Sequence, residues 1–202
     1  MRVLNVVAVL NAVLAGLGTG LSLIVVIGAQ NALVLRQGVL RQRVPVVVAI
    51  CAASDALLIA LGVGGVGSAL MAWPVVLEVV RWVGAAFLIG YGVLAVRRAV
   101  RPAALVVGAG SAGVVATCLA LTWLNPHVYL DTVLLLGTAS TGFGDQRWWF
   151  GAGAVLASAA WFSALGFGAR GLSGVLAKPT AWRVVDLGVA AVVTATGVSL
   201  VL

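Results

Sequence analysis

Charge is what this chain has least of. Of its 202 residues only 8% are charged, whereas 63% are hydrophobic. A soluble domain carries about 25% charged residues. Because so few charges cannot cover a soluble surface, we expect a polytopic membrane protein. The apolar run at about 3–35 exceeds the roughly 7–15 apolar residues of a signal peptide, so we interpret its beginning as a short extension before a retained helix.

Residues that carry chemistry are also few. The chain has one histidine, two cysteines and five acidic residues. One histidine and separated acids are a poor metal-ligand set, so we expect no metal or other cofactor. No Ser-His, paired-Asp or HExxH pattern indicates an intramembrane enzyme. Cys51 and Cys118 lie in apolar runs without CxxC spacing, which is typical of small buried residues. A membrane thiol-electron carrier would need cysteines at equivalent positions of two halves, and these two are not equivalent.

The net charge of +7 does not indicate nucleic-acid binding, because the basic residues fall in short clusters between apolar runs. Six apolar segments each have a length close to the about 20 residues that a helix needs to cross a bilayer. They lie at about 11–35, 45–70, 75–96, 111–138, 148–169 and 183–202. We therefore predict an all-α fold with six transmembrane helices in a single domain, 1–202. A five-span alternative arises because Pro74, Glu78 and Arg81 stand at the start of the third segment.

The basic clusters alternate along the chain as six spans require. Of the 12 Lys and Arg residues, nine fall on one predicted side and three on the other. The nine are Arg36, Arg41, Arg43, Arg97, Arg98, Arg101, Arg170, Lys178 and Arg183, and the three are Arg2, Arg81 and Arg147. Because positive loops stay in the cytoplasm, both termini are predicted outside it.

Three spans in each half make the second half, about 111–202, an inverted copy of the first, about 11–96. Inverted repeats place a substrate site near the midplane, where helices are interrupted. Polar breaks at 27–31 and 125–127 occupy corresponding places. Pro126 donates no N–H and biases Asn125 away from helical geometry. An ordinary kinked helix is the alternative at this position.

The second break lies in a polar island at 122–132, with the sequence TWLNPHVYLDT. Such a cluster in lipid is a functional-site hypothesis by default. His127 and Asp131 are four apart and share a helix face, where they could relay protons or simply form a hydrogen bond. A half-helix that starts at Pro126 would aim free N–H groups at an anion.

Three acids, Asp55, Asp131 and Asp186, lie inside predicted spans with no basic residue at their depth. Each is then protonated and hydrogen-bonded, hydrated, or paired with a cation from outside the protein. A carboxylate accepts a guanidinium in a bidentate way. The amides of Gln30 and Asn31 add donors and acceptors in the first half. This arrangement favours a small cationic substrate.

Several segments resemble the LysE-type lysine/arginine exporters. They are IGAQNALVLRQG at 27–38, CAASD at 51–55 and LTWLNPHVYLDT at 121–132, with smaller similarities at 81–84, 166–169 and 179–183. The residues at 54–55 and 129–131 look like the basic amino-acid branch. Two departures are Ala29, where the family usually has proline, and Asp186, where asparagine is expected.

The resemblance implies secondary-active export of lysine or arginine across the bacterial inner membrane, coupled to protons or the membrane potential. Export of neutral amino acids or related metabolites is the alternative, and a homo-oligomer stays open. The expected substrate-binding and coupling residues are Gln30, Asn31, Asp55, Asn125, Pro126, His127, Tyr129 and Asp131, with Gly28, Ser54, Thr122 and Asp186 in second place.

Overall fold

The computed structural model describes residues 2–25, 28–67, 74–100, 111–172 and 179–201, and every element bounded there is a helix. The predicted all-α class is confirmed for these ranges. The predicted ends of spans two and six at 68–70 and 202, and the basic residues Arg101 and Lys178, lie outside the described residues.

The predicted first span is two helices. α1 runs from Arg2 to Ile24 and α2 from Ala29 to Leu40. The expected N-terminal extension was wrong, because the helix already begins at Arg2. The predicted polar break is confirmed although Ala29 replaces the expected proline. Gly28, the N-cap of α2, is extended, with φ −109° and ψ −174°, so α2 begins as a separate helix.

Each of the next two predicted spans contains one long helix, but the second predicted span is interrupted at Gly64 and Gly65, a turn in which Gly65 has φ +91°. α3 runs from Val44 to Val63 and α5 from Pro74 to Val100. Proline is well placed at the start of α5, because the first N–H of a helix has no intrahelical partner to lose.

The fourth predicted span is broken where the sequence indicated. α6 (Ser111–Trp123) is followed by α7 (Pro126–Val128), the π-helix η2 (Tyr129–Leu135) and α8 (Leu136–Thr141). The two halves meet at 53°. Asn125, before the proline, is extended at φ −95° and ψ 105°. The break therefore has the cause expected of an X-Pro step.

The last two predicted spans are α9 (Arg147–Gly168) and α11 (Pro179–Ser199), and α9 continues into the 3-10 turn η4 (Ala169–Leu172). By length and hydropathy, three helices of the described chain can cross a membrane, and the bent pair around Pro126 would be a fourth. The chain is thus a multi-helix membrane protein, and the count of six stays a prediction.

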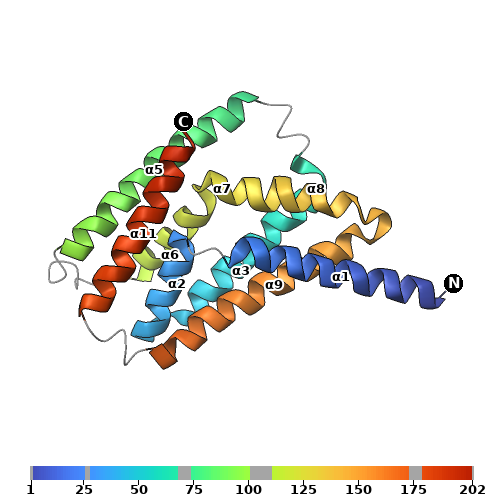
Figure 1. Cartoon of the computed structure of the whole chain (residues 1–202), viewed down its shortest axis with the longest axis horizontal. Coiled ribbons are helices and arrows are strands. Elements are labelled where there is room, and N and C mark those ends of the chain that lie inside the picture. Colours follow the sequence, from blue (N-terminus) through green and yellow to red (C-terminus); the bar gives the residue numbers. More distant parts are fainter. Residues whose placement is uncertain (1, 26–27, 68–73, 101–110, 173–178, 202) are drawn as a thin grey trace.

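Glycines allow two helix pairs to pack closely. α1 lies beside α9 (Figure 1), and a Cβ on Gly16 would overlap the backbone of Phe150. α3 packs against α8 in the same way, since a Cβ on Gly137 would lie 2.7 Å from the Gly62 carbonyl oxygen. A third pair, α5 and α11, stands side by side at the edge of the molecule (Figure 1). Close approach of helices through small residues is common in membranes.

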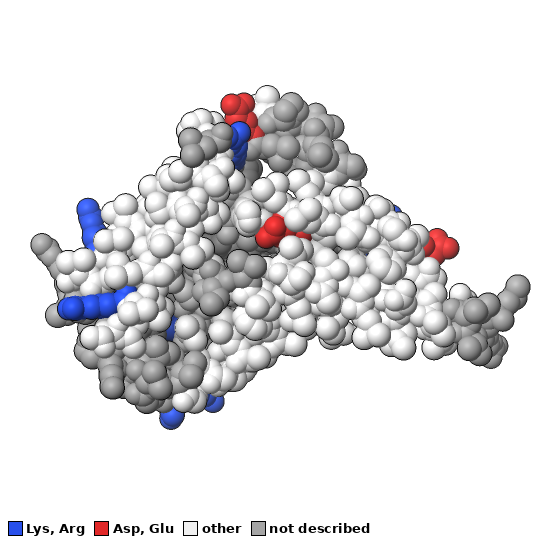
Figure 2. All heavy atoms as spheres, in the orientation of Figure 1, with Lys and Arg blue, Asp and Glu red and all other residues white. Residues whose placement is uncertain are grey.

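The basic ends of the helices gather at one end of the molecule. α2, α5 and α9 finish there and α11 begins there, at the lower left of Figure 1. In the same orientation, Lys and Arg side chains gather along the left and lower edge of the surface (Figure 2). The clusters that the sequence assigned to one side therefore lie together in space.

Candidate functional site

A cavity of about 280 Å³ lies where the two broken segments meet. Its walls come from the α1–α2 break, α3, the α6–α7 break with η2, and parts of α5, α9 and α11. Seven residues of the predicted site line it: Gly28, Gln30, Asn31, Asp55, Asn125, His127 and Asp131. The volume is just below the range of about 300–1,000 Å³ for small-molecule pockets, which suits one amino acid.

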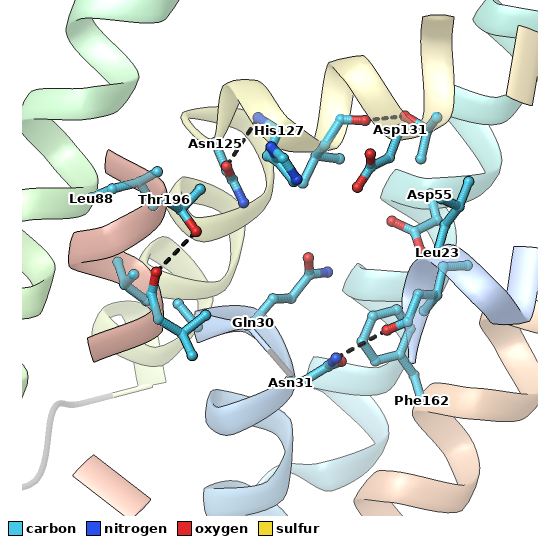
Figure 3. Close-up of a pocket in the computed structure, with 17 residues that line it drawn as sticks. Leu23, Gln30, Asn31, Asp55, Leu88, Asn125, His127, Asp131, Phe162 and Thr196 are labelled. Atoms are coloured by element: carbon cyan, nitrogen blue, oxygen red, sulfur yellow. Dashed lines mark hydrogen bonds between the residues drawn. The ribbon is translucent and has the colours of Figure 1, made fainter. Parts of the chain in front are cut away.

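Two carboxylates face this cavity from different helices. Asp55 comes from α3 and is 4% exposed, and its Oδ2 accepts a hydrogen bond of 2.7 Å from the buried Ser158 hydroxyl of α9. Asp131 comes from η2 and lies on the same side of the cavity in Figure 3. No Lys or Arg is among the cavity-lining residues of the described chain.

His127 also lines the cavity, four residues before Asp131. The predicted shared face is confirmed, because both side chains reach the same space (Figure 3). Within the described ranges, no group of three or more His, Cys, Asp and Glu could hold a metal ion.

At the first break, Asn31 joins three helices. Its Nδ2 donates to the Ile24 carbonyl at 3.0 Å, and its Oδ1 accepts from Trp161 Nε1 at 3.2 Å. The Ile24 carbonyl belongs to the last turn of α1, where backbone acceptors lack intrahelical partners. Asn31 therefore closes the end of α1 and ties it to α9.

At the second break, Tyr129 and Asn125 form hydrogen bonds with the backbone at the two helix ends. The Tyr129 hydroxyl donates to the Trp123 carbonyl at 2.8 Å, which closes the end of α6. The Asn125 Oδ1 accepts from the His127 N–H at 3.1 Å and so caps the start of α7. The N–H of His127 that was expected to face an anion is thus already occupied by a side chain.

The start of α2 differs, because its N-cap is Gly28, which has no side chain that could accept a hydrogen bond from the first turn. Gly28, Ala29 and Gln30 all line the cavity. The Gln30 Nε2 is buried and has no hydrogen-bond partner among the described residues. One buried donor of α2, the Gln30 Nε2, therefore stands beside the cavity.

The other predicted residues lie outside the cavity lining. The Ser54 hydroxyl accepts from Trp123 Nε1 at 3.2 Å, and the buried Thr122 hydroxyl donates to the Cys118 carbonyl. Pro126 is buried against Gly84 of α5. Asp186 lies on α11, half-buried and away from the cavity.

Sequence reasoning missed the residues that α9 and α11 contribute. Ser158 holds Asp55, Trp161 holds Asn31, and Thr196 of α11 lines the cavity opposite Asp55 (Figure 3). Single hydroxyls and indoles occur often in apolar helices, so nothing but spatial proximity distinguishes these three. Figure 2 shows acidic atoms beside a hollow near the middle of the visible face.

The two cysteines are neighbours, which their sequence positions did not indicate. Cys51 of α3 and Cys118 of α6 are fully buried and free, and their Sγ atoms are 3.4 Å apart. The interpretation as small buried residues agrees with this burial.

Comparisons with known proteins agree with this architecture. A model of the LysE type translocators matches residues 21–202. A candidate amino-acid transporter of Mycobacterium tuberculosis is 51% identical over 185 residues, which cover 90% of this chain and 91% of the relative. A lysine exporter of Corynebacterium efficiens is 37% identical and covers 93% of this chain and 96% of the relative. An arginine exporter of Yersinia enterocolitica is 42% identical, and the match covers 86% of this chain and 88% of the relative. No solved structure matches significantly.

Apolar helices around a polar cavity, with relatives that carry amino acids, define a multi-pass membrane transporter of the inner membrane. The chain belongs to the LysE family of translocators. Members of this family move solutes and are not enzymes.

Proposed function

We propose that this protein exports lysine or arginine from the cytoplasm and that the cavity between the two breaks binds the substrate. The observation that carries this proposal is the pair of carboxylates, Asp55 and Asp131, in a cavity without Lys or Arg. A basic amino acid has two cationic groups and one carboxylate, whereas a neutral amino acid has one of each. Two acids in a largely apolar space match the two cations of a basic substrate.

The relatives support the same substrate class, because two of them are named as lysine and arginine exporters. This chain carries both acids inside its helices: Asp55 lies in α3, and Asp131 lies in η2 after the proline break. A neutral amino acid would leave one of these carboxylates without a counter-charge at membrane depth, which is costly.

Export of a cation against an inside-negative potential costs about 2.3 kcal/mol per 100 mV for each charge. Exchange for an inbound proton cancels the net charge movement. Asp55 and Asp131 are the carboxylates of the cavity that can take up this proton when the substrate leaves, and His127 stands next to Asp131 in the lining. Coupling to protons therefore needs no residue beyond the cavity.

We also propose six spans in two inverted halves, both termini being outside the cytoplasm. If spans one to three correspond to spans four to six, contact between the first and fifth must be mirrored by contact between the second and fourth. α1 packs on α9, and α3 packs on α6, η2 and α8, both through close glycine contacts. α5 is the predicted third span and α11 the sixth, so exchange of the two halves leaves their contact unchanged.

Cells that lack or overproduce the protein test the substrate class directly. Feeding lysine-, arginine- or homoserine-containing dipeptides raises each intracellular amino acid in turn. We expect overproduction to lower intracellular lysine or arginine and leave homoserine unchanged. Export of homoserine alone would contradict the proposal and favour a neutral substrate. Collapse of the pH gradient at constant membrane potential should slow efflux, and unchanged efflux would exclude proton coupling.

A further inference from the structure

We propose that the first turn of α2 and the Gln30 amide form a subsite for the substrate's α-carboxylate. The cavity would then select amino acids over the amines left after loss of that carboxylate. This inference rests on the proposed function, because it assumes that the cavity holds the substrate, and it assigns the orientation of the molecule there.

The Gln30 side chain is the first observation. Its Nε2 is buried and makes no hydrogen bond of good geometry within the described residues, where only the weakly accepting Cys51 thiol interacts with it, and the side chain lines the cavity. Figure 3 shows the amide projecting from α2 into the open space. Buried donors without partners are rare in folded proteins, because burial removes their water hydrogen bonds. An oxygen of a bound molecule would supply the missing acceptor.

The start of α2 is the second observation, and it is independent of the first. α2 has 12 residues, and its N-cap, Gly28, has no side chain to cap the first turn. Gly28 and Ala29 line the cavity, so the start of this helix lies at its wall. A helix N-terminus carries partial positive charge and binds carboxylates through these groups. The start of α7 offers less, since Asn125 already accepts from the His127 N–H.

The charges on the other wall fix the direction of the substrate. Asp55 and Asp131 face Gln30 from across the cavity in Figure 3. A substrate carboxylate would be repelled by these acids, whereas an ammonium or guanidinium would be attracted to them. Asn31 is tied to α1 and α9, because one hydrogen of its Nδ2 is donated to the Ile24 carbonyl and its Oδ1 accepts from Trp161 Nε1.

Arginine and agmatine separate this inference from simple cation binding, since they differ only by the carboxylate. Proteoliposomes with the purified wild-type protein, preloaded with unlabelled arginine, should take up labelled arginine at least about 100-fold better than labelled agmatine, as expected for a site built to bind the missing group. Arginine should also raise the melting temperature of the purified protein, and agmatine should not. Equal uptake and equal stabilisation by the two compounds would overturn the inference.

Two variants locate the subsite. Gln30→Glu keeps the size of the side chain but places a negative charge beside the proposed carboxylate, so the preference for arginine over agmatine should fall by at least about tenfold. Gln42→Glu is the matched control, because Gln42 is exposed beyond the end of α2, and its preference should equal that of the wild type. An unchanged preference in folded Gln30→Glu would overturn the assignment.

Failure of the proposed function gives a different pattern. If the wild-type protein carries homoserine but neither arginine nor lysine, the basic substrate class is wrong. Uptake of homoserine against 3-amino-1-propanol then tests the carboxylate subsite in the same way. Equal uptake of these two compounds would overturn it independently of the substrate class.

Discussion

The two breaks in this molecule solve the same problem by different means. At each, a helix ends inside an apolar environment, and a side chain from the next helix reaches back to its last carbonyls. Asn31 reaches the Ile24 carbonyl at the first break, and Tyr129 reaches the Trp123 carbonyl at the second. The common need is that a carbonyl in lipid must find a donor within the protein.

The starts of the following helices differ. α7 begins with Pro126 and is capped by Asn125, whereas α2 begins after Gly28 and is uncapped. The second break is therefore complete in itself, and the acid that follows it, Asp131, faces the cavity. The first break leaves the buried Gln30 Nε2 beside the same cavity. The proposed site would thus bind cations on one wall and an anion on the other.

The acids should give the largest effect, because they define the cationic side of this comparison. Asp55→Asn and Asp131→Asn should each lower arginine efflux by at least about 100-fold, since each loses a counter-charge worth about 2.7 kcal/mol or more. Efflux from dipeptide-fed cells is the measurement. Asp145→Asn, at an exposed acid of η3 (Gly144–Gln146), is the matched control and should behave like the wild type. Wild-type efflux in both test variants would exclude the acids from transport.

The side-chain hydrogen bonds that close the ends of α1 and α6 should contribute differently to stability. Asn31→Leu leaves both the Ile24 carbonyl and the Trp161 N–H without partners, so it should cost about 2–4 kcal/mol of stability. Tyr129→Phe leaves only the Trp123 carbonyl and should cost about 1–2 kcal/mol. Thermal unfolding in detergent compares them. Equal losses would show that the contact between Asn31 and Trp161 contributes little.

The second break is also braced by α5 at a single point. A Cβ on Gly84 would overlap the ring of Pro126, so Gly84→Ala should lower stability by about 1–3 kcal/mol. Gly90 lies on the same helix, and nothing in the described chain lies within 4 Å of the place that a Cβ on Gly90 would take. Gly90→Ala should therefore not lower stability and should raise it by up to about 1 kcal/mol, because alanine favours the helix more than glycine does. Similar stability of the two variants would argue against close contact at the proline.

Loss of the Asn125 cap should lower stability less than loss of the Asn31 hydrogen bonds or of the Gly84 packing. Asn125→Ala removes the acceptor of the His127 N–H and should cost about 1 kcal/mol, whereas Asn125→Asp keeps a capping oxygen and should restore stability. Thermal unfolding of the two variants at equal pH measures the difference. If Asn125→Asp were as unstable as Asn125→Ala, the side chain would have a role other than capping.

The cysteine pair should give the smallest effect on transport. Cys51 and Cys118 lie outside the cavity lining, so the double substitution Cys51→Ser and Cys118→Ser should keep arginine efflux within about twofold of the wild type, as expected for buried thiols that only pack. Loss of efflux with normal protein levels would instead support a redox role for the pair.

Much of the fold followed from composition and local sequence. The scarcity of charge indicated a membrane protein, and Pro126 indicated the second break at the correct residue. The first break was also located, although its cause was not: Gly28 in an extended conformation replaces the proline. The start of the first helix was wrong, because the residues before 11 are as apolar as those after them and carry no stop signal.

The candidate site followed only in part. Polar residues in apolar runs are conspicuous, so seven of the predicted residues proved to line one cavity. Ser158, Trp161 and Thr196 were not conspicuous, since hydroxyls and indoles are ordinary in membrane helices. Their places depend on which helix faces which, and hydropathy does not determine that.

The sequence by itself determined that this chain crosses a membrane, that two of its helices are interrupted by polar motifs, and that it belongs with amino-acid exporters. These properties depend on composition and on residues adjacent in the chain. Only the tertiary structure decided that Gln30 and Asp131 share one cavity and that Asn31 and Tyr129 close helix ends. A side chain satisfies the nearest unpaired group in space, and packing alone sets which group is nearest.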